Sequence, residues 1–392
     1  MESIVQNAIH KANLKNMEEE KEKIEKRNLK IASGKMERKQ VDTDEELRRI
    51  VEGIKTSIKV VGAGGAGSNT LDRLMEMGIE GGDVIAVNTD ALDLLYTKTP
   101  TKVLIGASIT GGIGAGNNPE IGEKCAEADA KKIEEVLTGA DMVFITCGLG
   151  GGTGTGSVPV IAEIAKEQNA LTIGVVTLPF TVEGRVRAKN ALTGLKKLRK
   201  YADTVIVIPN DRLLDVAPNL PLNTAFKVAD ELLANAVKGI TEMVTKPGLI
   251  NLDFADVKAV MSDGGTALIG MGSSTKDTPM DERSRESVEK ALKSPLLDTD
   301  VSTATGALIN VIGSRDMTLE EAEEIVKIVS ETISPNATII WGAQIDDSLD
   351  RNIIKTLLIL SGVKTPKYEE ELEELVESEA PVEHADMGLK YV

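Results

Sequence analysis

Two glycine clusters in the first half of the chain have the composition and position of phosphate-binding loops. The first, GAGGAGSN, directly follows an apolar run and contains the pattern GxGxxG at Gly62, Gly64 and Gly67. A helical pattern begins near Leu71. A strand, a glycine turn and a helix in that order point backbone N–H groups and a helix dipole at an anion. Alone, the pattern fits tight packing, a nucleotide site, or a dinucleotide site, which Asp90 beyond the next apolar run suits.

The second cluster, GLGGGTGTGS over residues 148–157, favours a phosphate site of another kind. Several adjacent N–H groups can turn toward phosphate oxygens there, and the Thr153 and Thr155 hydroxyls add donors. A dinucleotide fold has no standard use for a second glycine run, and a merely flexible loop would cost stability without a ligand. The motif GxxxxGK[ST] is absent from the sequence, which excludes the ordinary P-loop. A third group, GGIGAGNNP at 111–119, fits either a flap over the phosphates or a plain loop.

The elements that must position these loops alternate between apolar strands and helices from residue 57 onward. Such alternation is typical of a mainly parallel sheet with helices on both faces and right-handed crossovers. We therefore predict an α/β fold with a Rossmann-like, parallel-sheet domain over 45–222, whose ligands bind at the carboxyl ends of the strands. The strands are expected at 57–61, 83–87, 102–105, 141–146, 171–177 and 204–208.

The second half of the chain predicts a long central helix and a smaller domain. Residues 223–246 form one helical pattern with little polar face, so we expect this helix to lie buried between domains, with an acidic loop completing the segment to 262. Residues 263–363 predict an α+β domain. A polar helical extension at 1–44 and an acidic tail at 364–392, expected to be disordered or a solvated helix, flank these units. Strands of the smaller domain are expected at 266–271, 306–312, 337–341 and 354–360, and helices at 281–293 and 318–333.

The composition narrows the class of function. A formal net charge of −17 argues against broad nucleic-acid binding and against direct adhesion to anionic lipid. Two cysteines outside any CxxC pair predict neither a disulfide framework nor a zinc site, and we assign no metal ligand in the chain. No apolar run approaches the roughly 18 residues of a membrane span, so we expect a cytoplasmic protein without membrane insertion. Both histidines lie in the terminal extensions, which makes histidine general-base chemistry an unattractive hypothesis.

The motif GGTGTG at 151–156 resembles the signature of the tubulin/FtsZ GTPase family, and an ordered set of further motifs resembles FtsZ, in a pattern more like its archaeal members. The resemblance covers about residues 45–363 and implies a GTP-binding domain, a long central helix and a C-terminal domain. The further motifs are VTLPFTVEGRVR at 176–187, IPNDRLL at 208–214, AFKVAD at 225–230, NLDFADV at 251–257, SPLL at 294–297 and ALIN at 307–310.

This resemblance implies a cell-division GTPase. Its substrate would be GTP with Mg²⁺, and it would assemble head to tail into filaments at a mid-cell ring, hydrolysing GTP at subunit junctions. The partners implied are other copies of the chain, a membrane-tethering adaptor such as SepF, reached through the C-terminal tail, and an FtsZ paralogue.

The family's nucleotide-binding roles carry over onto matching residues. Phe226 and Asp230 are i and i+4 on one helix face, so the ring can stack on a base while the carboxylate accepts from guanine N1–H and N2–H₂. Without the motif, Phe226 would be a core residue and Asp230 a surface charge. The resemblance places Glu183 and Arg187 at the ribose and phosphates. The remaining residues implied to bind nucleotide are Gly64, Gly65, Asn69, Gly150, Gly151, Gly152, Thr153, Gly154, Thr155, Gly156 and Asn210.

The acidic loop after the central helix carries the residues implied to be catalytic. From the sequence alone, Asp253 could cap the helix that starts near residue 254, with Asp256 in its first turn. A helix of 24 residues spans about 35 Å, so with Phe226 at the base this loop must lie far from its own phosphates. The resemblance implies that Asn251, Asp253 and Asp256 act instead on the nucleotide of the neighbouring subunit.

Two other classes of function stay open from the sequence. A nicotinamide-dependent oxidoreductase is suggested only by the pattern GxGxxG. The second alternative is a scaffold that binds nucleotide without hydrolysing it. The presence of both Asp253 and Asp256 argues against this alternative.

Overall fold

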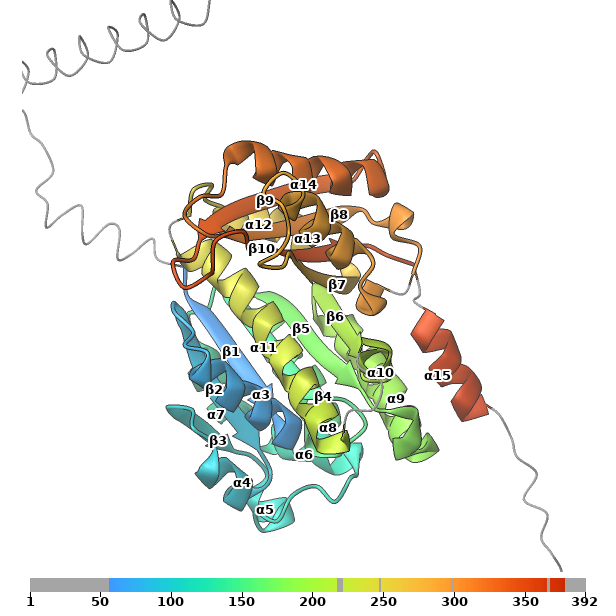
Figure 1. Cartoon of the computed structure of the whole chain (residues 1–392). Helices are drawn as coiled ribbons and strands as arrows, with labels where there is room; N and C mark the ends of the chain where they lie inside the picture. Colours follow the sequence, from blue (N-terminus) through green and yellow to red (C-terminus); the bar gives the residue numbers. More distant parts are fainter. Residues whose placement is uncertain (1–55, 217–220, 247, 298, 365–366, 378–392) are drawn as a thin grey trace, which may run out of the picture. The chain divides into compact units, whose positions relative to one another are not determined.

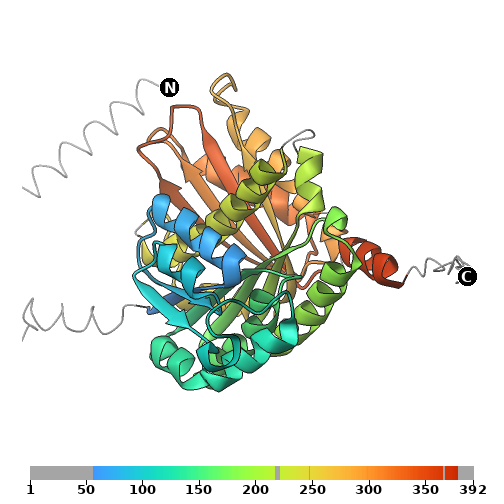
Figure 2. The same ribbon diagram turned by 90° about the horizontal axis from the view of Figure 1, so that it is seen from below.

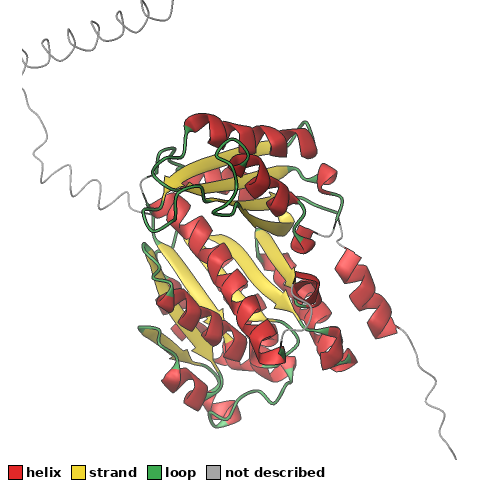
Figure 3. Cartoon of the chain, in the orientation of Figure 1, coloured by secondary structure: helices red, strands yellow, loops and turns green. Residues whose placement is uncertain are grey.

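A computed structural model describes residues 56–216, 221–246, 248–297, 299–364 and 367–377. The predicted extension at 1–44 and the end of the predicted tail lie outside the described residues. Figure 1 shows the described part as a twisted sheet with helices packed on both faces, and Figure 3 separates the strands from the helices around them.

The first six strands form the predicted parallel sheet. Their order is β3-β2-β1-β4-β5-β6, so the sheet runs outward in two directions from β1 and β4. All five neighbouring pairs are parallel, as expected for strands joined by helical crossovers. The predicted strands are confirmed to within about two residues at either end. Their bounds are β1 Ile58–Ala63, β2 Gly82–Asn88, β3 Thr101–Leu104, β4 Met142–Gly148, β5 Leu171–Leu178 and β6 Thr204–Pro209.

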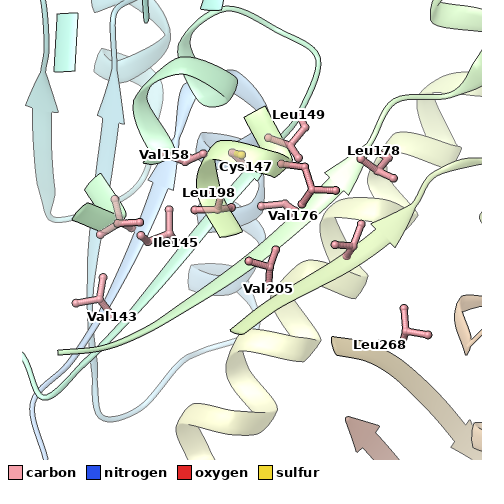
Figure 4. Close-up of a cluster of buried hydrophobic side chains, with 14 of the residues drawn as sticks. Val143, Ile145, Cys147, Leu149, Val158, Val176, Leu178, Leu198, Val205 and Leu268 are labelled. Carbon is pink, nitrogen blue, oxygen red and sulfur yellow. The ribbon is translucent and has the colours of Figure 1, made fainter. Parts of the chain in front are cut away.

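Alternate residues of these strands face two different cores. In β4, Met142 and Phe144 point toward one face, whereas Val143, Ile145 and Cys147 point toward the other. Figure 4 shows Ile145 and Cys147 of the second set near Val158 of α8 (Thr153–Glu167) and Leu198 of α9 (Arg185–Tyr201), in the same buried cluster. Both faces are covered, which explains why the strands read as continuous apolar runs. The helices of this half are α3 Gly64–Glu76, α4 Ala91–Tyr96, α5 Ala107–Thr110, α6 Pro119–Ala128, α7 Ala130–Leu137, α8 Thr153–Glu167, α9 Arg185–Tyr201 and α10 Asp211–Val216, with a 3₁₀ turn η1 at Thr181–Glu183.

The second half joins the same sheet. Strands β7, β10, β8 and β9 follow β6 in the order β6-β7-β10-β8-β9, and β6 pairs with β7 through only three residue pairs. The sequence predicted a separate α+β unit, and the structure adds that its sheet is continuous with the first. The bounds are β7 Gly265–Ser273, β8 Gly306–Gly313, β9 Thr338–Ile345, β10 Ile354–Ser361, α13 Arg283–Leu292 and α14 Leu319–Thr332, with 3₁₀ turns η2 Pro295–Leu297 and η3 Val301–Thr303.

The long central helix α11 spans Leu222–Thr245, as predicted. Its apolar side chains pack with those of α3 and α12 (Phe254–Met261) against one face of the sheet. Figure 1 shows α11 crossing that face, and Figure 2 gives the same helix from below. The loop beyond it is tied to β9, because Ile250 forms an isolated bridge with Ala343.

The predicted tail needs a correction at its start. Residues 367–377 form a helix, α15, rather than disordered chain or a solvated helix, because Tyr368 and Leu372 are buried. These two residues are i and i+4, so they share one helix face, and α15 packs through it. Residues 365–366 and 378–392 of the predicted tail lie outside the described residues.

Candidate nucleotide site

A cavity of about 270 Å³ opens at the carboxyl ends of β1, β4, β5 and β6. This is where ligands bind in sheets of this topology, since the strand order reverses between β1 and β4. The starts of α3, α8 and α11 complete its wall. The residues lining it are Ala63, Gly64, Gly65, Ala66, Gly148, Leu149, Gly151, Gly152, Thr153, Gly154, Thr177, Pro179, Glu183, Arg187, Asn210, Phe226, Ala229 and Asp230.

The N-termini of α3 and α8 both face this cavity, and neither helix carries an acidic residue in its first turn. The first turn of a helix leaves N–H groups without a partner inside the helix, and its dipole favours an anion. A carboxylate there would compete with a bound phosphate. The starts of α3 and α8 are therefore suited to hold phosphate oxygens.

Glycine is required where the two loops touch. Gly64 has φ +69°, and a Cβ there would lie 2.9 Å from the backbone nitrogen of Gly154. A Cβ on Gly151, by contrast, would meet nothing within 4 Å, so Gly151 faces open space in the cavity. Thr153 adds a hydroxyl, which is 2.5 Å from that of Thr89. Both predicted glycine loops thus contribute to one cradle.

The opposite wall presents a ring and a carboxylate. Phe226 is 39% exposed and packs edge-on against the buried ring of Phe180, with 5.2 Å between centroids, so one face is available for stacking. Asp230 lies one turn further along α11 and accepts a long hydrogen bond of 3.4 Å from Thr70 Oγ1. Burial raises the pKa of Asp230 to about 6, against the opposing effect of the Thr70 hydroxyl.

Asn210 is the third polar group on this wall. It is 4% exposed, and its Oδ1 is buried without a hydrogen-bond partner in the described chain. A buried acceptor without a partner costs free energy, so a ligand that donates to it would bind favourably. Phe226 and Asp230 come from α11 and Asn210 directly follows β6, and all three line the same cavity.

Glu183 and Arg187 line the mouth of the cavity and hold each other. Arg187 Nη1 donates to Glu183 Oε2 over 2.5 Å, and the second carboxylate oxygen accepts from the Phe180 N–H over 2.9 Å. Arg187 is about half exposed, so its guanidinium remains available to a polar ligand.

Four predicted residues lie off the cavity wall. Thr155 accepts from the Gly150 N–H at 2.8 Å, which fixes the loop from within. A Cβ on Gly156 would lie 2.0 Å from the Pro119 carbonyl oxygen, so this glycine allows α8 and α6 to pack closely. Asn69 is exposed on α3 without lining the cavity. In the stretch of alternating Gly and Thr, some residues therefore line the cavity and others serve packing.

Other lining residues escaped the sequence-based prediction. Thr177 and Pro179 come from the end of β5 and Ala229 from α11, where the chain shows no glycine cluster. The only feature of the sequence that could have indicated them is that they lie within the motifs at 176–187 and 225–230. Asp90, which had suited a dinucleotide, instead caps α4 by accepting from the N–H groups of Leu92 and Asp93.

The acidic loop lies outside this cavity. Asp253 caps α12 by accepting from the Asp256 N–H at 2.8 Å, and Asp256 Oδ2 accepts from the Asp253 N–H at 3.2 Å. Asn251 Oδ1 accepts from the Gly248 N–H. The capping interpretation is thus correct, and it leaves both carboxylates at the surface, beyond the far end of α11.

The described residues were also compared with the requirements of a reactive thiol, a metal site and a membrane-spanning helix. Cys125 and Cys147 are buried, and burial raises the pKa of both thiols, which disfavours thiolate chemistry. Within residues 56–377 as described, no group of three or more His, Cys, Asp or Glu side chains is placed to hold a metal ion. In the same part of the chain, no helix has both the length and the apolar composition needed to cross a bilayer.

Comparison with known proteins gives a family for both halves of the chain. Residues 57–218 match the model of the Tubulin/FtsZ family, GTPase domain, and residues 265–364 match the FtsZ family, C-terminal domain. Cell division protein FtsZ 1 of Thermococcus kodakarensis is 57% identical over 88% of this chain and 90% of its own length. The FtsZ 1 protein of Methanocaldococcus jannaschii is 54% identical over 90% of this chain and 93% of its own.

A solved structure supports the same family. An FtsZ from M. jannaschii, described as an empty dimer, superposes with a TM-score of 0.78 at 56% identity, covering 82% of this chain and 92% of that one. The parallel sheet, the glycine cradle, the two matched domains and these identities agree. The chain belongs to the FtsZ group of the tubulin/FtsZ family of GTPases.

Proposed function

We propose that this GTPase works in cell division and hydrolyses GTP at the junction between two copies stacked head to tail. One copy would supply the nucleotide cavity, and the next would supply Asn251, Asp253 and Asp256. The observation that carries this proposal is the separation of the two sets of residues. They lie at opposite ends of the 24-residue helix α11, which spans about 35 Å.

The nature of the two ends supports a contact between copies. Large apolar side chains are exposed around the cavity end, including Tyr96 at 75%, Ile113 at 85% and Val182 at 81%. Leu249, beside the acidic loop, is 61% exposed. Two different surfaces that meet head to tail make a heterologous contact, which propagates as a filament unless it closes. One similar solved protein is itself described as a dimer.

The nucleotide fits the cavity by chemistry. The starts of α3 and α8 would hold the phosphates, Glu183 and Arg187 would lie at the ribose, and Phe226 would stack on the base. Asp230 would accept from guanine N1–H and N2–H₂, whereas adenine offers an acceptor at N1 and would leave the carboxylate unpaired. This wall therefore selects guanine.

Mg²⁺ would be held mainly by phosphate oxygens and water, as is usual for this ion, because the described chain offers no cage of carboxylates. Its chemistry would be neutralisation of phosphate charge. The carboxylates of Asp253 and Asp256 would orient and polarise the attacking water once a neighbour brings them to the phosphates. Positioning of that water would contribute more than proton transfer.

The decisive experiment removes a carboxylate but keeps the helix cap. Asparagine caps helices about as well as aspartate, so Asp253→Asn should preserve α12. We expect this variant and Asp256→Asn to bind GTP and assemble normally, and to release phosphate at least 100-fold more slowly. Thr318→Ala, which loses the similar capping box of α14, controls for the effect of a damaged helix cap and should hydrolyse GTP at the normal rate.

A mixing test then asks whether the site is shared. Asp256→Asn keeps an intact cavity, whereas a cavity variant such as Asp230→Ala keeps an intact acidic loop. The two variants are mixed in equal amounts at a GTP concentration too low to fill the weakened cavity of Asp230→Ala. On the order of a quarter of the contacts should then be productive junctions, and the mixture should hydrolyse GTP faster than either variant alone. Mixtures no more active than the separate variants would contradict a shared site.

Location and further partners belong to the same proposal. We infer assembly at a mid-cell division ring, a membrane-tethering adaptor such as SepF bound through the C-terminal tail, and co-assembly with an FtsZ paralogue. Imaging of a tagged chain in dividing cells, and co-sedimentation of filaments with the adaptor before and after removal of residues 380–392, test these inferences.

A further inference from the structure

The helix α15 lies against the outer side of the wall that forms the nucleotide cavity. A narrow gap of about 40 Å³ separates Tyr368, Glu371 and Leu372 of α15 from Pro179 and Thr181, in the loop after β5. Pro179 also lines the nucleotide cavity itself. One loop thus has the nucleotide site on one side and α15 on the other.

Ion pairs hold α15 to the GTPase half at three places. Arg199 of α9 makes a two-pronged contact with Glu369, which is 6% exposed, and Arg199 is 24% exposed. Lys196 pairs with Glu373 at 2.8 Å. Buried and two-pronged pairs contribute more than exposed ones, so the Arg199–Glu369 pair should dominate this attachment.

The third pair connects α15 to a second segment of the cavity wall. Arg212 Nη2 donates to both oxygens of Glu371 at 2.8 and 2.9 Å. Arg212 follows Asn210, whose side chain lines the nucleotide cavity, by two residues. Between them, Asp211 accepts from the Thr181 N–H at 3.1 Å and from the Thr181 hydroxyl at 2.6 Å.

These contacts form a closed connection. The loop after β5 is fastened to the start of α10 through Thr181 and Asp211, and both segments are backed by α15. Each segment contributes to the cavity, Pro179 and Glu183 from one and Asn210 from the other. α15 follows the C-terminal half of the fold in sequence, so a piece of chain from beyond that half supports the site in the first half.

We propose that α15 is a positioning element of the nucleotide site. Docked on α9 and α10, it holds Pro179, Glu183 and Asn210 in the arrangement that binds nucleotide, and its release lowers nucleotide affinity. By linkage, bound nucleotide strengthens the docking of α15 by the same factor. The inference rests on the proposed nucleotide site and adds a regulatory contact to it.

The test compares matched pairs of charge changes on the same helix in the full chain. Glu369→Gln/Glu373→Gln removes both carboxylates that pair with α9. Glu370→Gln/Glu374→Gln removes two exposed carboxylates from α15 and changes the net charge equally, so it serves as the control. We expect the first variant to bind GDP about fivefold more weakly or worse, the lower end of ordinary coupling between sites, and the control to bind normally.

A charge exchange tests the contact with α10. Glu371→Arg should weaken GDP binding, and adding Arg212→Glu should restore part of the loss, because the pair is re-formed with opposite sign. Hydrogen exchange of residues 367–377 supplies a readout of docking, and should be slowed by GDP in the wild-type chain. A general loss of folding would instead speed exchange throughout the sheet.

The outcomes separate the two proposals. If the wild-type chain fails to bind guanine nucleotide, the proposed function is wrong. If it binds, and variants whose α15 exchanges rapidly bind GDP as tightly as the wild type, the positioning role of α15 is wrong. Variants in which α15 still exchanges slowly should keep normal affinity; weakened binding with α15 still docked would also overturn the inference.

Discussion

Lowering the pH should weaken guanine-nucleotide binding in a way that depends on one carboxylate, Asp230. Its pKa is raised from the ordinary value of 3.8 to about 6, chiefly by burial. Only the ionised carboxylate can accept from both guanine N1–H and N2–H₂, so protonation competes with the base. For a single competing proton, the apparent Kd rises by the factor 1 + 10^(pKa − pH), which is about 4 at pH 5.5 and close to 1 at pH 7.5.

The nucleotide itself also titrates in this range, since a terminal phosphate has a second pKa near 6. Asp230→Asn removes the contribution of the protein to the pH dependence of binding and keeps the contribution of the nucleotide. The quantity to compare is therefore the Kd of Asp230→Asn divided by the Kd of the wild-type chain at each pH. Loss of the charged acceptor should weaken GDP binding about 10-fold at pH 7.5, from roughly 1–3 kcal/mol for such a hydrogen bond. At pH 5.5 the ratio should fall to about a quarter of that value.

The assay is fluorescence anisotropy of a labelled GDP, measured from pH 7.5 to 5.5, which stays above the sequence pI of 4.8. Unfolding through this group is not the explanation for weaker binding. A carboxyl whose pKa is higher in the folded chain binds its proton more tightly there, so its contribution to stability grows as the pH falls from about 6 toward 3.8. A ratio that stays constant across the range would refute the assignment of Asp230 to the base.

Three further predictions concern packing and assembly. Gly151→Ala should weaken GDP binding and leave the melting temperature within about 2 °C, because its Cβ meets only open space, whereas Gly156→Ala should lower the melting temperature by several degrees, since its Cβ would collide with backbone. Thermal denaturation with and without GDP separates the two effects. Leu249→Glu should raise the protein concentration needed for GTP-dependent sedimentation by about 10-fold and leave GDP affinity unchanged, because it places a charge in the proposed contact between copies; equal sedimentation would contradict that contact. Arg283→Met should destabilise the fold by about 3–5 kcal/mol in urea unfolding, because the wholly buried guanidinium pairs with Glu321 and Asp316 and its loss leaves both carboxylates without a cationic partner.

Much of the nucleotide site could be predicted because its determinants are local. A glycine run between a strand and a helix sets the direction of N–H groups within a few residues, so Gly64, Gly65 and residues 151–154 could be placed from sequence. The i,i+4 spacing of Phe226 and Asp230 is likewise a local property of one helix. The alternation of apolar strands with helices predicted a parallel sheet. In such a sheet these groups gather at the carboxyl ends of the strands.

Contacts between distant segments decided the rest. Whether Gly156 faces a ligand or a neighbouring helix depends on the position of α6, which no feature near residue 156 specifies. Asn210 acquires its unpartnered oxygen only because other elements bury it. The acidic stretch at 367–377 has the composition of a solvated segment. It nevertheless packs on the GTPase half, because Arg199 and Arg212 of that half pair with its glutamates. Sequence alone determined which residues have the chemistry to meet a phosphate or a base, since that is a property of short segments. Tertiary structure decided which of them line the cavity, because burial and close approach arise only when distant segments pack together.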